Sequence, residues 1–439
     1  MNIKLSNNTD KYYYIITVLL IGIVLILTSI VPVDKLAMAA VLLLSILCLK
    51  KVVNNIILTL LFTVILYCNY SIIKMNFCDP NNYIFTTFNN TPIGTLSLQV
   101  LTLFLAYIWA FLPNNIKEFD DKKLYYNKNI NILIHIGIIC IAIFATILGY
   151  KSAGIGQRGV YSTIYGYVVL FIALGLFYSN NNKYLKVFYL IISIYYVMKN
   201  LMHGERAYVL QMALLLFVYY MPKKWQKKWW LWLLACVMGY IALTYISEAR
   251  TYGWNFESFC LTMTNCVDRG FALDTACSSF YTSQTFLAVS FNDGMGKRLV
   301  MFLSWVASIF VGGSIIPNSN LSSYTRQFYT HWYGGCLPFY GYYYLSIFGT
   351  VLFAFYITIL INRQNKNLNT SLFNLILINI MYSVFTWYLY SPSALTRGLL
   401  LAIILFYSIK LADLILQKIH KKVLLFRKNK KDKNDAHQT

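Results

Sequence analysis

The segment 130–149, INILIHIGIICIAIFATILG, contains no Asp, Glu, Lys or Arg in twenty consecutive residues. A helix needs about 20 mostly apolar residues to cross the hydrocarbon core of a membrane, and this segment reaches that length without a charge. Similar apolar runs recur along the whole chain, so the predicted fold class is an all-α polytopic integral membrane protein. We expect about twelve transmembrane helices, at residues 12–31, 36–49, 53–72, 94–112, 130–149, 162–179, 184–199, 206–221, 229–247, 339–361, 371–390 and 396–414.

The composition excludes other classes of protein. The chain is 58% hydrophobic and 12% charged, with a mean hydropathy of +0.57, whereas a soluble domain carries about 25% charged residues. The net charge of +22 does not indicate nucleic-acid binding, because the lysines lie between apolar runs. A single cleaved signal peptide does not explain repeated runs, and a β-barrel would require alternating strands of about ten residues, which the sequence lacks.

The basic residues predict the orientation. Cytoplasmic loops of membrane proteins are enriched in Lys and Arg. With both termini in the cytoplasm, 25 of the 37 basic residues lie inside. We therefore predict a multi-pass protein with both termini cytoplasmic and with a basic tail, residues 415–439, at the inner surface of the membrane.

The predicted external part is residues 248–338, between helices in 1–247 and helices in 339–414. Within it, residues 299–316 are apolar enough to span, but one extra crossing would place the basic tail outside. Two interpretations keep the tail inside. Either 299–316 is a re-entrant or interfacial segment, or a partner span lies in 275–291.

In this topology most lysines lie on the cytoplasmic side of the membrane, and most arginines lie on the outer side or at its edge. Lysine is a hydrated point charge suited to lipid headgroups, whereas arginine is a planar fork that binds phosphate through two parallel hydrogen bonds. Arginines on the outer side are therefore candidates for an anion site, although each could instead pair with a nearby carboxylate. The candidate anion-binding residues are Arg206, Arg250, Arg269, Arg298, Arg326 and Arg397.

Aromatic residues and one histidine are concentrated at the end of the external region. Rings beside polar groups can stack on a sugar, so Tyr324, Trp332 and Tyr333 are the predicted glycan-binding residues. His331 lies among these rings, and a histidine can act as a general base near neutral pH. The alternatives are a loop packed on the membrane and a structural histidine.

Two further expectations concern buried polar side chains. His135, in the middle of a span, is expected to make a helix–helix hydrogen bond. The external cysteines could form a Cys260–Cys266 or a Cys277–Cys336 disulfide, or they could be unpaired and buried.

Several short motifs suggest a family. They are Gly204-Glu205-Arg206-Ala207 before an apolar run, Ile315-Ile316-Pro317, Gly334-Gly335, and Tyr344-Leu-Ser-Ile-Phe348-Gly349. In these motifs and in its pattern of spans, the chain resembles the O-antigen polymerases, which are related to the O-antigen ligases. The acidic residue that often precedes the Tyr-rich segment in that family is missing near Tyr342.

The resemblance implies a metal-independent, inverting-type glycosyltransferase in the bacterial inner membrane. Such an enzyme joins undecaprenyl-pyrophosphate-linked oligosaccharide repeat units at the periplasmic face. The resemblance implies that the six candidate arginines bind the pyrophosphate of the lipid carrier. His331 or Asp268 would then be catalytic and accept a proton from the attacking sugar hydroxyl. It would need no cofactor, would contact membrane lipid and a chain-length regulator protein, and would bind no nucleic acid. A ligase that transfers the glycan to lipid A-core and a flippase for the lipid-linked unit remain alternative functions.

Overall fold

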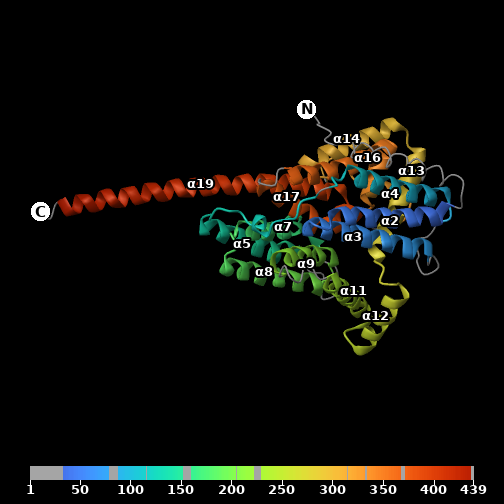
Figure 1. The fold of residues 1–439 in the computed structure, drawn as a ribbon, viewed down its shortest axis with the longest axis horizontal. Helices are drawn as coiled ribbons and strands as arrows, with labels where there is room; N and C mark the ends of the chain where they lie inside the picture. The colour runs from blue at the N-terminus through green and yellow to red at the C-terminus, as the bar shows by residue number, and fades with distance from the viewer. Residues whose placement is uncertain are drawn as a thin grey trace. The chain divides into compact units, whose positions relative to one another are not determined.

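The computed structural model describes residues 33–78, 88–114, 116–151, 160–203, 205–221, 229–313, 315–331, 334–366 and 371–436. These residues are nearly all helical, which confirms the predicted α-helical class (Figure 1). A short antiparallel pair of strands, β1 (Tyr150–Lys151) and β2 (Val160–Tyr161), is the exception in the described part. The chain divides into two compact units, which are described separately here.

Unit 1 contains residues 1–119, 213–369 and 380–397. Its elements are α2 (Val33–Val52), α3 (Ile56–Ile73) with the π-helical turn η1 (Lys74–Cys78), α4 (Pro92–Phe111), α11 (Trp229–Tyr252), α12 (Phe256–Asp268), α13 (Asp274–Asn292), α14 (Met295–Val311), α15 (Leu321–Thr325), α16 (Leu337–Lys366) and α18 (Val384–Leu389). Unit 2 contains η3 (Asp121–Leu124), α5 (Ile132–Leu148), α6 (Thr163–Gly166), α7 (Val168–Tyr178) and α8 (Lys183–Met202). The residues of α9 (Arg206–Tyr220), α17 (Ser371–Tyr382) and α19 (Pro392–Ala436) are divided between the units.

Five helices of the described chain are long and apolar enough to cross a membrane. They are Ile56–Cys78, Pro92–Phe111, Lys183–Met202, Leu337–Arg363 and Pro392–Val423. Shorter apolar helices occupy Ile132–Leu148, Val168–Tyr178, Arg206–Tyr220, Val237–Ile246 and Ser371–Tyr382. The predicted span 12–31 lies outside the described residues. The membrane class is thus supported, whereas the count of twelve spans stays a prediction.

In unit 1, α4 packs against α2 and α16, and polar groups close the helix ends. Asn55 caps α3 by accepting a hydrogen bond from the Leu58 backbone N–H at 3.3 Å. The Lys51 ammonium group donates to the carbonyls of Trp109 (2.7 Å) and Leu112 (3.2 Å) and lies 4.6 Å from the centre of the Trp109 ring. Lys51 therefore satisfies carbonyls that the end of α4 leaves without helical partners.

Helix α13 is buried on all sides from Ala276 to Ser290, although it is rich in Ser and Thr. Most of these hydroxyls donate to carbonyls of the preceding turn, as Ser283 does to Ser279 at 2.8 Å. Gln284 reaches Asn89 at 3.2 Å on a different segment. The region 275–291 is helical, as α13, and this helix contacts α3, α4 and α16. Helix α13 is not among the helices of the described chain that are long and apolar enough to cross a membrane, so both interpretations of the region stay predictions.

Helix α14 follows α13 after a two-residue turn, Asp293–Gly294. One face of α14 is buried and contains Met301, Trp305 and Ile309. The opposite face exposes apolar side chains, including Val300 (62%) and Phe310 (73%). The predicted segment 299–316 is thus helical to Val311 and has an apolar outer face, as expected of a helix in contact with lipid.

Helix α16 is interrupted, whereas the apolar run 339–361 predicted one continuous span. Leu345 (φ −133°, ψ 22°) and Ser346 (φ 56°, ψ −146°) have non-helical backbone angles. At the interruption, the two halves of α16 approach so closely that a Cβ on Gly349 would lie 2.0 Å from the Gly341 carbonyl oxygen. The Thr350 hydroxyl also donates to the Pro338 carbonyl at 3.2 Å. Hydropathy does not register this break, because the residues on both sides of it are apolar.

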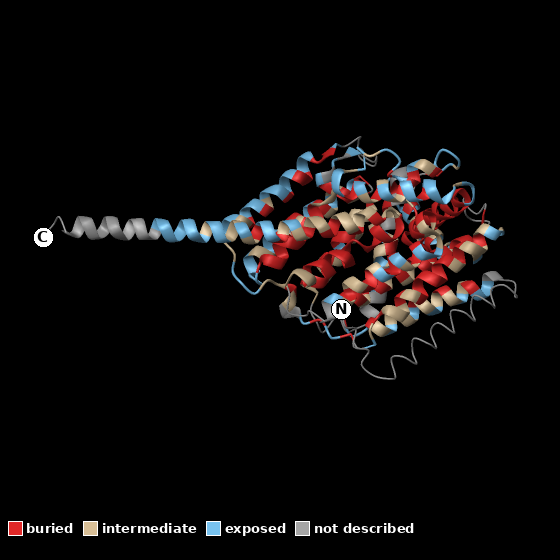
Figure 2. Ribbon diagram, turned by 90° about the horizontal axis from the view of Figure 1, so that it is seen from above, coloured by how far each residue is buried: buried red, intermediate tan, exposed pale blue. Residues whose placement is uncertain are grey.

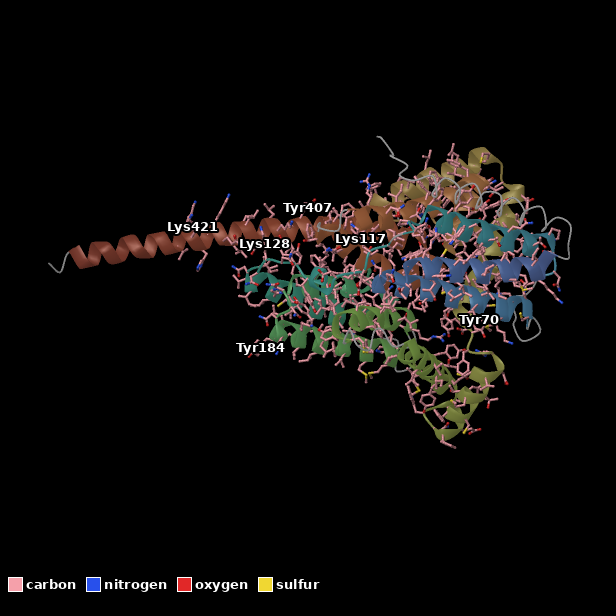
Figure 3. All side chains as sticks on the ribbon, in the orientation of Figure 1. Tyr70, Lys117, Lys128, Tyr184, Tyr407 and Lys421 are labelled. Carbon is pink, nitrogen blue, oxygen red and sulfur yellow. The ribbon has the colours of Figure 1, made fainter. Side chains whose placement is uncertain are left out.

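In unit 2, α7 packs against α5 and α8. His135 Nδ1 lies 3.0 Å from the Tyr189 hydroxyl, which confirms the predicted helix–helix hydrogen bond. The outer faces are apolar, with Phe144 64% exposed on α5. Tyr184 on α8 and Tyr407 on α19 project away from their helices, 81% and 56% exposed (Figure 3). Beyond Lys410, α19 is exposed along most of its described surface (Figure 2).

In the described part of the chain, the four cysteines of the two predicted disulfides are free thiols, so neither disulfide is present. Cys266, Cys277 and Cys336 are buried thiols, whereas Cys260 is exposed on α12. The alternative of unpaired cysteines is therefore the one observed.

Candidate functional site

A group of charged and phenolic side chains gathers around the turn between α13 and α14 in unit 1. Asp293 Oδ1 accepts hydrogen bonds from the Lys297 ammonium group at 2.9 Å and from the Tyr324 hydroxyl at 3.0 Å. Asp293 Oδ2 accepts one from the Tyr343 hydroxyl at 2.7 Å. Arg298 lies beside Tyr343, with 5.7 Å between its guanidinium carbon and the ring centre. We call these five residues the Asp293 cluster.

Four elements supply the cluster. Asp293 ends α13, and Lys297 follows one helical turn later on α14, so the two form an i,i+4 ion pair. Tyr324 lies on α15, which begins where Asn320 caps the Ser323 backbone N–H at 3.2 Å. Tyr343 lies in the last turn of α16 before its interruption.

The cluster combines a buried carboxylate with an exposed cation. The side chain of Asp293 is 8% exposed and that of Lys297 is 51% exposed. Burial opposes ionisation of Asp293, but hydrogen bonds from Lys297, Tyr343 and Tyr324 outweigh it and hold the pKa of this carboxyl below its usual value. Hydrogen bonds to Asp293 and Tyr324 raise the pKa of Lys297. The exposed Lys297 ammonium group suits a negatively charged ligand, whereas the buried Arg298 guanidinium donates to backbone carbonyls of α16.

These two pKa shifts predict that the stability contributed by Asp293 and Lys297 does not change with pH around neutrality. The lowered pKa of Asp293 stabilises the fold above the usual carboxyl value and loses that contribution as pH falls through the folded pKa. The raised pKa of Lys297 stabilises the fold below its usual value and loses that contribution as pH rises through the folded pKa. We expect the Tm difference between wild type and Asp293→Asn to stay constant from about pH 5 to 9 and to shrink below about pH 4.

Thermal unfolding of the purified protein in detergent measures that difference. A difference that already declines between about pH 7 and 6 would mean that Asp293 takes up a proton near neutrality, against the lowered pKa.

Of the six arginines predicted to bind pyrophosphate, only Arg298 belongs to the Asp293 cluster. Arg298 is 8% exposed and donates to backbone carbonyls of α16. Arg397 donates to the Ser308 carbonyl at 2.7 Å. Arg326 is exposed directly after α15, and Arg269 follows the end of α12.

The remaining two arginines belong to α9 and α11. Arg206 is the first residue of α9 and belongs to unit 2. Arg250 is on α11, and its side chain lies outside the described part of the structure. The six arginines therefore lie on or beside several different helices, and Arg298 is the member of this set that belongs to the Asp293 cluster.

The predicted proton acceptors and glycan-binding residues also separate. His331 is 1% exposed, and its Nε2 lies 3.0 Å from the Thr325 hydroxyl, an interior position that suits a structural role. Asp268 is exposed at the end of α12. Tyr324 belongs to the Asp293 cluster, whereas Trp332 and Tyr333 lie outside the described residues.

Sequence reasoning did not single out Asp293, Lys297 or Tyr343 as site residues. The available signal was the Asp-x-x-x-Lys spacing across Gly294 at the start of a helix. The hydrogen bond from Tyr343 to Asp293 joins residues 50 positions apart, so no local motif announces it. Within the described residues, no group of three His, Cys, Asp or Glu side chains could hold a metal ion.

Comparison of the chain with protein-family models, curated proteins and solved structures gives no match.

Proposed function

We propose that this protein is a membrane glycosyltransferase that polymerises undecaprenyl-pyrophosphate-linked oligosaccharide repeat units into O-antigen or a related surface polysaccharide. It would act at the periplasmic face of the bacterial inner membrane, with both termini cytoplasmic and with a chain-length regulator protein as partner. The helical membrane architecture and the motif resemblance support this class.

The observation that carries the proposal is the exposed Lys297 ammonium group, which a buried carboxylate orients beside two tyrosine hydroxyls. Glycosyl transfer from a lipid carrier releases a pyrophosphate, and negative charge grows on it as the glycosidic bond breaks. A fixed cation at that position stabilises the transition state more than the ground state. Tyr324, beside Lys297, provides a ring and a hydroxyl for the sugar.

The lowered pKa of Asp293 decides its role in this proposal. A carboxylate that already accepts three hydrogen bonds is a weak base, so we assign Asp293 to orientation of Lys297, Tyr324 and Tyr343 rather than to proton abstraction. Among the other arginines, exposed Arg326 follows Tyr324 most closely in the chain and is the nearest candidate for a second phosphate contact.

The test is polymer formation by the purified protein in liposomes that contain the lipid-linked repeat unit. We expect a ladder of lipid-linked glycans whose length increases with time. Addition of lipid A-core distinguishes the related ligase, which would transfer glycan to this acceptor and build no ladder without it. Liposomes that give neither product would contradict the glycosyltransferase class.

The interruption of α16 favours a second candidate, a flippase for the lipid-linked repeat unit. Interrupted membrane helices line substrate sites in many transporters. A flippase would move a fluorescent lipid-linked unit between the leaflets of a liposome without lengthening its glycan. Chain growth in the same liposomes excludes a function limited to translocation.

A further inference from the structure

The interruption of α16 frees backbone groups that a continuous helix would pair. The helix N-terminal to the break ends at the Tyr-rich turn, and Leu345 and Ser346 leave helical geometry. A carbonyl in the last turn of a helix has no intrahelical donor. In a membrane protein, such carbonyls need another partner because lipid supplies none.

Arg298 is that partner. Its Nε donates to the Tyr343 carbonyl, and its Nη2 donates to the Tyr342 carbonyl at 2.6 Å and to the Ser346 hydroxyl at 3.1 Å. One guanidinium from α14 thus donates hydrogen bonds to two carbonyls and one hydroxyl at the break. A planar fork with several fixed donors suits this geometry, whereas the ammonium group of lysine does not.

Ser346 indicates that tertiary contacts maintain the break. At φ 56° and ψ −146° it occupies a region that glycine adopts and that strains residues with a Cβ. Such a conformation persists only where surrounding contacts hold it. The hydrogen bond from Arg298 to the Ser346 hydroxyl is one such contact.

We propose that Arg298 is a positioning residue that fixes the interruption of α16 and thereby holds the Tyr343 hydroxyl against Asp293. Tyr343 lies at the end of the half-helix that Arg298 caps, and its hydroxyl is 2.7 Å from Asp293 Oδ2. Arg298 therefore acts on Tyr343 and Asp293 through the backbone of α16. The consequence for transfer rests on the proposed function, whereas the consequence for α16 does not.

Hydrogen exchange measured by mass spectrometry tests the conformational claim on the full-length protein in detergent. In Arg298→Ala, the carbonyls of Tyr342 and Tyr343 lose a charged donor, so we expect amides in residues 340–347 to exchange about tenfold faster or more. Arg298→Lys keeps the charge without the fork and should give an intermediate rate. Arg363→Ala, an exposed arginine farther along α16, is the matched control and should leave this segment unchanged.

Equal exchange in wild type, Arg298→Ala and Arg298→Lys would overturn the proposal, because the break would then be fixed without Arg298. If Arg298→Ala fails to fold, the Arg298→Lys protein decides alone. Faster exchange confined to residues 340–347 of this variant would support the proposal. Exchange at the wild-type rate would contradict it.

Transfer kinetics separate positioning from direct binding of the lipid carrier. For a positioning residue, we expect Arg298→Ala to lower kcat about tenfold with little change in KM. A higher KM with unchanged kcat would instead indicate that Arg298 binds substrate, and would contradict its role as a positioning residue. If the wild-type protein shows no transfer at all, the proposed function fails, while the exchange experiment still decides the role of Arg298.

Discussion

Substitution of Lys297 by methionine is expected to lower the rate of polymer formation about 10²- to 10³-fold, the loss typical of removing one preorganised stabiliser of developing negative charge. The ammonium group of Lys297 is half exposed and is held by Asp293 and Tyr324. Methionine keeps the length of the side chain and removes the charge. The measurement is the initial rate of glycan elongation in liposomes with purified protein.

The fold should tolerate this substitution. Lys297 is half exposed, so solvent screens its attraction to Asp293, and Asp293 would retain its two tyrosine donors. Lys50→Met replaces an exposed lysine at the end of α2 and is the matched control, with an expected rate close to wild type. Lys297→Met protein that elongates glycan at the wild-type rate would remove the Asp293 cluster from the proposed mechanism.

The helical class could be predicted from the sequence because hydropathy is a local property. Apolar runs such as 130–149 need no tertiary information to be recognised as helices suited to lipid. The partner of His135 was also predictable in kind, because a polar group within a span needs one. Its identity, Tyr189, was not predictable, since the pairing depends on how α5 and α8 pack.

The Asp293 cluster was not predictable for the same reason. Tyr324 and Tyr343 are 31 and 50 residues from Asp293 and reach it only after α15 and α16 have packed beside α13. Only the Asp293–Lys297 spacing was visible in the sequence. A single sequence without homologues does not pair such distant residues.

Arg298 shows why residue type alone was an incomplete guide. An arginine within an apolar segment suggests a bound anion, because an unpaired guanidinium is costly there. The structure satisfies Arg298 with carbonyls that the break in α16 releases. The alternative partner considered for each arginine was a nearby carboxylate, and backbone carbonyls were not considered. The interruption thus supplies a partner for Arg298 that a continuous helix would not offer.

Gly349→Ala is expected to be strongly destabilising, by about 3 kcal/mol or more. Its Cβ would lie 2.0 Å from the Gly341 carbonyl oxygen and 3.0 Å from the Leu345 Cβ. The close atom is backbone, so relief requires the two halves of α16 to separate. Overpacking of a buried site typically costs about 1–3 kcal/mol, and immovable backbone places this substitution at or above that range.

The matched control is Gly137→Ala, within α5, where an added Cβ has nothing within 4 Å. This substitution should leave stability unchanged or raise it by up to about 1 kcal/mol, since alanine favours helix. Thermal unfolding of both variants gives the comparison. Equal Tm values for Gly349→Ala and Gly137→Ala would contradict the close crossing at Gly341 and Gly349. Without that crossing, the sharp interruption of α16 would lose its packing basis, and Tyr343 would lose the half-helix that presents it to Asp293.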